Sequence, residues 1–194
     1  SWVNGIEYRA DLKEGKLQNV LFIKNYWQRV RTEREIIGSE QVSVSERKIS
    51  DIGWGNNLRY NFSNKLTAKL SYEYALRLPR PDEIFGDGNF IVRNLDLEAE
   101  RGHNLNLSAI LRNPASSNIQ WRLETAGSFR SINDLIFLVA ATDRTSAFDN
   151  INEATSVGIE LAGEVSGLIE GLKISLNSTY QDFYNNAAEG DFAR

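Results

Sequence analysis

Residues 66–78 read LTAKLSYEYALRL, and this stretch decides the fold class of the chain. Apolar or aromatic side chains occupy every second position, namely Leu66, Ala68, Leu70, Tyr72, Tyr74, Leu76 and Leu78. The positions between them carry Thr67, Lys69, Ser71, Glu73, Ala75 and Arg77. This alternation predicts a β-strand with one apolar and one polar face, because successive side chains of a strand point to opposite sides. A helix would place Lys69 beside Leu66 and so mix the two faces.

The same alternation recurs along the chain and predicts eight strands and no helix. Besides residues 66–78, the expected strands are 2–12, 17–33, 52–62, 99–112, 119–141, 150–165 and 172–181. The connections alternate in length: the short ones are 13–16, 63–65, 113–118 and 167–171, and the long ones are 34–48, 79–98 and 142–149. All three prolines lie outside the expected strands, where a β-ladder tolerates them. The expected fold class is therefore all-β and antiparallel.

Strand length distinguishes a transmembrane barrel, whose apolar face contacts lipid, from a soluble sandwich, whose apolar face packs against a second sheet. Thirteen extended residues span about 43 Å, and a tilt of about 45° turns this into a rise of roughly 30 Å, the thickness of a bilayer core. Strands of soluble sandwiches are usually about 5 or 6 residues long. The polar face mixes charges of both signs, as expected of a wet interior. We expect a segment of a transmembrane β-barrel, with a soluble β-sandwich or long-hairpin sheet as the alternative.

Composition excludes several kinds of site. The 194 residues contain no cysteine and one histidine, so a Cys/His zinc site, a disulfide and a cysteine nucleophile are excluded. His103 shares the register of the apolar face, which favours an interfacial or packing role over catalysis. The 22 basic and 26 acidic residues leave a net charge of −4, which argues against a nucleic-acid surface. We expect no enzymatic activity, no metal site and no cofactor.

Two stretches carry motifs in a distinctive order. In the first, Arg77-Leu78-Pro79 precedes Asp82-Glu83-Ile84-Phe85-Gly86 and then Asn94-Leu95-Asp96-Leu97-Glu98-Ala99-Glu100. In the second, residues 148–154 (FDNINEA) precede Val157-Gly158-Ile159-Glu160-Leu161. In order and spacing both stretches resemble the family of TonB-dependent outer-membrane receptors. Glu98-Ala99 departs from it, because the family usually has Lys-Pro before this glutamate.

The resemblance implies a 22-stranded barrel, of which residues 1–194 would supply eight strands within one β-barrel domain. We expect no counterpart of the family's N-terminal plug domain or of its TonB-contacting segment within residues 1–194. The implied function is energy-dependent uptake of a scarce ligand (siderophore, metal chelate, vitamin or glycan) through the outer membrane of a Gram-negative bacterium. Implied partners are the plug, the TonB system acting through it, membrane lipid and lipopolysaccharide. The alternatives are an autonomous small barrel with a structural or adhesive role and a soluble ligand-binding β-sandwich.

The resemblance and the alternation also single out site residues. Glu100 and Glu160 match acidic positions of the two motifs, and both have the parity of the polar face, so we expect them to contact the plug. Short turns of outer-membrane barrels face the periplasm and long loops face outward, which places loop 79–98 outside the cell. The candidate ligand-facing residues at this loop are Arg77, Arg80, Asp82, Asp87 and Arg93. A solvated or turn-forming role is the alternative for its carboxylates, and lipopolysaccharide binding for its arginines.

Overall fold

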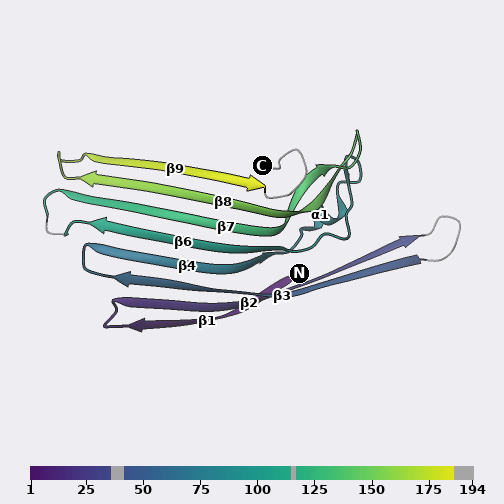
Figure 1. Ribbon diagram of the computed structural model, residues 1–194, viewed down its shortest axis with the longest axis horizontal. Coiled ribbons are helices and arrows are strands. Elements are labelled where there is room, and N and C mark those ends of the chain that lie inside the picture. The colour runs from purple at the N-terminus through teal and green to yellow at the C-terminus, as the bar shows by residue number, and fades with distance from the viewer. Residues whose placement is uncertain (36–41, 115–116, 186–194) are drawn as a thin grey trace.

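The computed structural model describes residues 1–35, 42–114 and 117–185, and these form a single sheet with one short helix (Figure 1). The elements are β1 (Trp2–Leu12), β2 (Leu17–Glu35), β3 (Val42–Asn61), β4 (Leu66–Arg77), α1 (Pro81–Phe85), β5 (Ile91–Val92), β6 (Glu100–Arg112), β7 (Gln120–Ala140), β8 (Ser146–Ser166) and β9 (Lys173–Asn185). The long strands pair antiparallel with their neighbours in chain order, and only β5 pairs parallel, with β8.

Each of the eight expected strands is present as a long strand, but two expectations about connections were wrong. Because β3 begins at Val42, most of the connection expected at 34–48 is strand, and residues 36–41 of it lie outside the described ranges. The expectation of no helix was also wrong, because α1 forms inside loop 79–98. Pro81 presets the helical φ angle of its first turn, and the Glu83 side chain caps its N-terminus.

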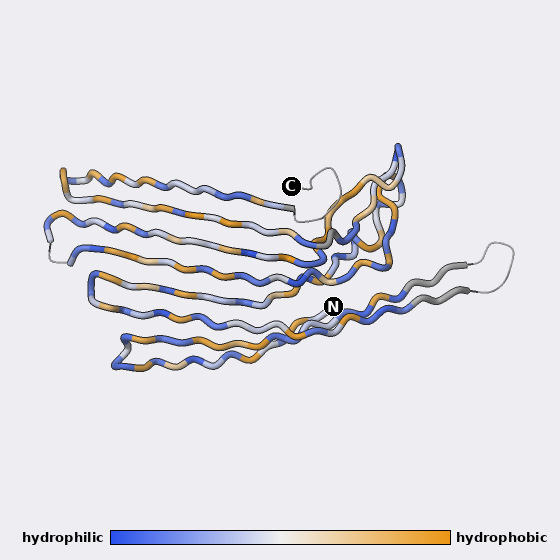
Figure 2. The backbone as a smooth tube through the Cα atoms, viewed as in Figure 1, coloured by the Kyte–Doolittle hydropathy of each residue, from blue (hydrophilic) through white to orange (hydrophobic). Residues whose placement is uncertain are grey.

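The register sorts the side chains onto two faces. One row across the sheet joins Leu58, Leu70, Leu107, Gly127 and Ile159, and we call this side the apolar face. The next row joins Arg59, Lys69, Ser108, Ala126 and Glu160 on what we call the polar face. Figure 2 shows the resulting alternation along each strand. None of the residues that the structure describes covers the apolar face here, since Leu107 and Ile159 are each 58% exposed.

The sheet is neither a sandwich nor a closed small barrel. All nine strands of the described ranges belong to one sheet, so the β-sandwich alternative was wrong. The strand order begins at β1 and has β9 at its other side, and no pairing joins these two strands within the described residues. Both are therefore open edges, as in a segment of a larger barrel. No helix in this part of the chain is long and apolar enough to cross a bilayer.

Buried side chains gather where the long connections lie. The buried hydrophobic residues are Tyr26, Leu76, Ile84, Leu97, Ala99, Ile132, Ile136 and Ala154. Leu76 is 7% exposed because it packs with Tyr26 and Ala99, so the apolar alternation of β4 is covered within the chain at this residue. We call residues 78–99, together with the strand ends they contact, the cap. The half of the sheet next to the short turns is called the belt.

Candidate functional site

Arg77, the last residue of β4, joins two carboxylates at the base of the cap. Its Nη1 donates to both oxygens of Glu83 at 2.9 and 3.0 Å, and its Nη2 donates to Oε1 of Glu100 at 2.6 Å. The Glu83 and Glu100 side chains are only 4% and 5% exposed. Charge-assisted hydrogen bonds of this kind are stronger than neutral ones. Arg77 therefore fixes α1 to the ends of β4 and β6.

The two carboxylates also bind backbone groups. Glu83 Oε2 accepts the N–H of Arg80 at 2.8 Å, which satisfies a free donor at the start of α1. Glu100 Oε1 accepts the N–H of Ile136 at 2.9 Å and so reaches β7. The position of helix α1 thus depends on contacts with the sheet beneath it as well as on the hydrogen bonds at its own N-terminus.

An apolar cluster lies beside this charged network. Ile84 of α1 and Leu97 pack against Ile136 of β7, and Val30, Leu95 and Phe148 complete the cluster. By register Ile136 and Phe148 belong to the polar face, which therefore becomes apolar where the cap covers it. The cap lies on the polar face of the sheet and covers these apolar side chains.

Arg101 centres a second network, which sequence reasoning missed. It contacts Asp51 Oδ2 at 3.2 Å and Asp134 Oδ2 at 2.9 Å. Asp134 lies within β7 with a φ of 58°, a conformation that asparagine, aspartate and glycine tolerate best. Its backbone carbonyl accepts the side-chain N–H of Asn150 at 2.6 Å. No sequence pattern signals a left-handed residue in the middle of a long strand.

The tip of the loop is held by Asp87 and by β8. Asp87 Oδ1 accepts the backbone N–H groups of Asn89, Phe90 and Ile91 at 2.8–2.9 Å. These bonds, with that of Ile91 the strongest, lower the pKa of the Asp87 carboxyl. The parallel pairing of β5 with β8 and a 2.8 Å bond from Ser146 N–H to the Phe90 carbonyl join this tip to the neighbouring hairpin. Asp87 therefore forms a turn, and its contact with a ligand stays a prediction.

The structure separates only some of the residues that the sequence grouped together. Arg80 and Asp82 are exposed side by side, at 64% and 67%, and Arg93 is exposed on the same loop. Arg77 is half-buried and shares Glu83 with Arg80, whose Nε donates to Glu83 Oε1 at 3.3 Å. Glu100 and Glu160 share the polar face but not a location, because Glu100 is buried under the cap and Glu160 is exposed in the belt.

His103 lies on the apolar face among aromatic rings. Its Nδ1 is 2.8 Å from the Tyr72 hydroxyl, and its ring centroid is 5.1 Å from that of Tyr74. Within residues 1–35, 42–114 and 117–185, no group of three or more acidic or histidine side chains could hold a metal ion. The grouping of His103 with Tyr72 and Tyr74 is typical of the aromatic girdle of a barrel at a membrane interface.

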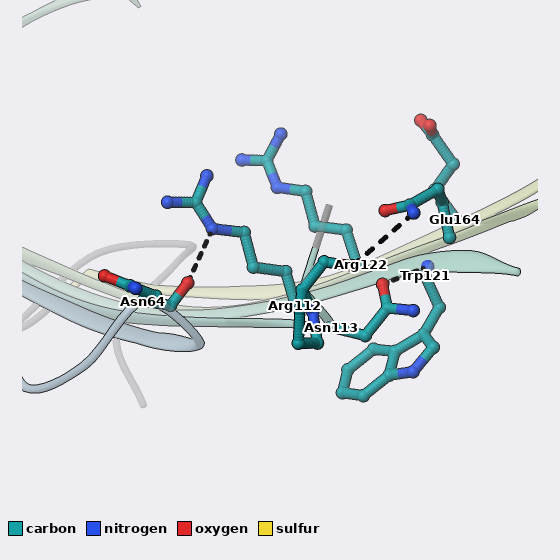
Figure 3. Close-up of a pocket in the computed structure, with 8 residues that line it drawn as sticks. Asn64, Arg112, Asn113, Trp121, Arg122 and Glu164 are labelled. Atoms are coloured by element: carbon teal, nitrogen blue, oxygen red, sulfur yellow. Dashed lines mark hydrogen bonds between the residues drawn. The ribbon is translucent and has the colours of Figure 1, made fainter. Parts of the chain in front are cut away.

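A pocket of about 590 Å³ lies at the opposite end, beside the short turns (Figure 3). Arg112 and Arg122 face each other across β6 and β7 and extend to the same side of the sheet, while Trp121 points to the other side. Each arginine has a partner: Arg112 Nε donates to the Asn64 carbonyl at 3.2 Å, and Arg122 Nη2 donates to Glu124 at 2.6 Å.

Comparisons with known proteins agree with this architecture. Residues 27–193 match the family model described as TonB dependent receptor-like, beta-barrel. No curated protein sequence matches the chain. Among solved structures, a double mutant of the Serratia marcescens hemophore receptor HasR, in complex with HasA and heme, is 12% identical with a TM-score of 0.75, covering 93% of this chain and 33% of that one. The copper transporter OprC is 14% identical with a TM-score of 0.73, covering 95% and 28%.

The FrpB iron transporter from Neisseria meningitidis is 17% identical with a TM-score of 0.64, covering 96% of this chain and 26% of that one. At these identities the likeness concerns the fold. The chain spans 26–33% of the length of these three proteins, so it corresponds to one part of each barrel.

Proposed function

This chain belongs to the TonB-dependent receptor-like β-barrel family, and from that premise we propose that it forms part of a Gram-negative outer-membrane receptor for energy-dependent ligand uptake. One observation carries the proposal. The described residues form a single sheet of long antiparallel strands whose apolar face is uncovered and whose polar face is partly covered by a structured loop. In this role the apolar face contacts lipid and the polar face lines the lumen.

Strand length supports an external position for the cap. The 21 residues of β7 extend about 69 Å, so a strand tilted by about 45° rises roughly 49 Å, well beyond a bilayer core of about 30 Å. The short turns face the periplasm in this orientation, and the excess length projects outward with the cap. Outer-membrane lipid then surrounds the belt, and lipopolysaccharide surrounds its outer rim.

The ligand, in this proposal, is a scarce siderophore, metal chelate, vitamin or glycan that contacts the cap. The similar structures are a copper transporter, a hemophore receptor in complex with its hemophore and heme, an iron transporter and, from Pseudomonas aeruginosa, a siderophore receptor. The exposed side chains of Arg80, Asp82 and Arg93 are the proposed contacts, with Arg77 and Asp87 holding the loop that presents them. A loop held at several points suits binding, because less conformational entropy is lost when a ligand arrives.

We further propose that the plug domain of the same receptor occupies the lumen and links it to the TonB system. Glu160 is the more accessible plug contact, since it is exposed on the polar face of β8. Glu100 would have to receive a plug cation through Oε2, because Oε1 accepts both hydrogen bonds from Arg77 and Ile136. Glu160→Gln should raise leakage of small antibiotics through the receptor at unchanged abundance, and a full-length structure with no plug cation near Glu160 would contradict this contact.

Uptake by cells carrying the full-length receptor tests the proposal. Radiolabelled ferric chelates, a heme, cobalamin and an oligosaccharide are offered to energised cells and to cells whose proton gradient is collapsed. We expect one class to accumulate only in energised cells with the receptor, and Arg80→Ala combined with Arg93→Ala to lower its binding. Accumulation that persists without the gradient would indicate passive diffusion and would overturn the proposal.

A further inference from the structure

The apolar face of β2 and β3 changes abruptly from aromatic to basic near the outer ends of these strands. On β2, Trp27 lies on this face beside Trp2 of β1, with the two ring centroids 6.1 Å apart. The next position of the same face is Arg29, and Lys48 of β3 lies directly opposite it. Both cations are exposed, at 47% and 62%. Aromatic side chains followed by cations are typical of the place where a strand leaves the hydrocarbon core.

The length of β2 agrees with this position. Leu17 is the first residue of β2 after the short turn, and Arg29 lies 12 residues beyond it. Twelve extended residues span about 40 Å, and a tilt of about 45° turns this into a rise of roughly 28 Å. A bilayer core is about 30 Å thick, so Arg29 reaches its outer boundary when the short turns face the periplasm.

The cap covers the opposite face of the same two strands. Gln28 Nε2 donates to the Pro79 carbonyl at 2.8 Å, and Arg47 Nη1 donates to another backbone carbonyl of the cap at 2.9 Å. Arg29 and Lys48 alternate with these residues along β2 and β3, so their side chains lie on the side away from the cap. In the proposed receptor this side faces the membrane and not the lumen.

One carboxylate serves both cations. Glu46 Oε2 accepts a hydrogen bond from Arg29 Nη2 at 2.7 Å, and Glu46 Oε1 is 3.0 Å from Lys48 Nζ. These three side chains therefore carry a net positive charge. A guanidinium and an ammonium each have more N–H donors than one carboxylate oxygen uses, so both cations keep donors for a further anion.

Other charged side chains of the apolar face near the cap do not offer such a group. Arg101 of β6 is already held by two carboxylates, those of Asp51 and Asp134. Glu153 of β8 is exposed and would repel an anion. Compared with these positions, β2 and β3 present the better site for a negatively charged group.

We propose that Arg29 and Lys48 bind a phosphate group of lipopolysaccharide in the outer leaflet, which rests on the outer-membrane position in the proposed function. The phosphates of a lipid lie just beyond its acyl chains, at the level that Arg29 reaches. The acyl chains of the same molecule contact the apolar face below, beginning at Trp2 and Trp27. Exposed cations hold a free small anion only weakly, but a phosphate anchored by its own acyl chains is present at high effective concentration.

The test measures lipid binding by the full-length receptor, purified in detergent and freed of bound lipid. Phosphorylated lipid A is titrated, and the bound fraction is followed by native mass spectrometry. We expect Arg29→Gln combined with Lys48→Gln to weaken binding about thirtyfold, as the loss of two cations at an anionic lipid surface would. Dephosphorylated lipid A should bind the parent as weakly as phosphorylated lipid A binds this variant. Glu46→Gln should strengthen binding, because the carboxylate competes with phosphate for both cations.

The matched control changes an arginine and a lysine that also lie directly opposite each other, but on the polar face. Arg59→Gln combined with Lys69→Gln removes the same charge and should leave lipid binding unchanged. Equal affinity of the parent for phosphorylated and dephosphorylated lipid A would overturn the proposal, as would full affinity in Arg29→Gln with Lys48→Gln. Tight binding of inorganic phosphate alone, lost in that variant, would overturn it in favour of a free anion. Neither a transported ligand nor an energy source enters this measurement, so its failure is distinguishable from failure of the uptake proposal.

Discussion

The belt and the cap share the same strands but bury different surfaces. In the belt the apolar face is open, and Ile159 remains 58% exposed. In the cap the polar-face position Ile136 is 7% exposed, because Ile84 of α1 and Leu97 of the loop pack against it. The cap is therefore stabilised by contacts within this chain, whereas the belt depends on lipid and on the rest of the barrel.

This difference explains the longest apolar run in the sequence, residues 135–141. By register Leu135 and Phe137 belong to the apolar face, while Ile136 belongs to the polar face under the cap. Both faces are apolar at this place because the cap covers the polar face, which faces water in the belt. An uninterrupted apolar run within an alternating strand can thus mark where a loop folds onto a sheet.

Removing the arginine of the cap should give the largest effect. Arg77→Ala leaves the buried carboxylate of Glu100 without a cation and leaves Glu83 with only the exposed Arg80, and breaking a buried pair typically costs about 3–5 kcal/mol. The loss should fall on the cap alone, so surface protease should cleave residues 79–98 while the barrel keeps its abundance and its migration in unheated gels. Arg80→Ala is the comparison: Arg80 also contacts Glu83 Oε1 at 3.3 Å, but its side chain is 64% exposed and Arg77 remains, so the loss should be much smaller. Loss of the whole receptor in Arg77→Ala would show that cap and belt are one unit.

A charge on the apolar face should instead affect the belt. Leu70→Arg places a cation against lipid, which costs about 2–4 kcal/mol near the bilayer midplane and should lower the amount of assembled receptor. Ser71→Arg is the matched control on the polar face. It is a better control than Thr67→Arg, because Thr67 is 6% exposed and donates a hydrogen bond to Asn61. Equal assembly of both variants would mean that the faces are assigned the wrong way round.

The belt could be predicted from the sequence because its two environments impose a local rule. Lipid on one side and water on the other require alternation at every second residue, so residues 66–78 identify their own faces. The strand ends were predicted less accurately. Strand β3 begins ten residues earlier than expected, because charged residues on both faces obscure the alternation there.

The cap could not be predicted in this way, because its contacts join residues far apart in the chain. Helix α1 has five residues, too few to show a period, and its Ile84 finds its partners at Leu97 and Ile136. Glu100 was expected to face the plug from its motif and parity, but parity does not reveal that Arg77 already occupies its Oε1. Whether plug contact also occurs there stays a prediction.

The strained residue beneath the cap should give a smaller effect. Asp134→Ala puts a residue with no side-chain hydrogen bond into a left-handed conformation and removes the contact with Arg101, for a loss of about 1–2 kcal/mol. Asp134→Asn keeps the tolerance for this φ angle and should lose less. Hydrogen exchange at the amides around Asn150, whose side chain binds the Asp134 carbonyl, measures the difference. If Asp134→Asn were as damaging as Asp134→Ala, the charge and not the backbone would be decisive.

Acid should give the smallest effect, confined to the tip of the cap. The backbone N–H groups of Ile91, Asn89 and Phe90 hold the pKa of Asp87 below its ordinary value of about 3.9. The ionised carboxylate therefore stabilises the tip fully above that ordinary value, and this contribution is lost as the pH falls through the lowered pKa. Exchange at the Phe90 and Ile91 amides, compared at matched intrinsic rates, should accelerate only in this acidic range. Asp87→Asn should remove that pH dependence while the belt amides behave as in the parent. An acid response that survives in Asp87→Asn would assign the effect to another carboxylate of the cap, such as Asp82, which is exposed on the same loop.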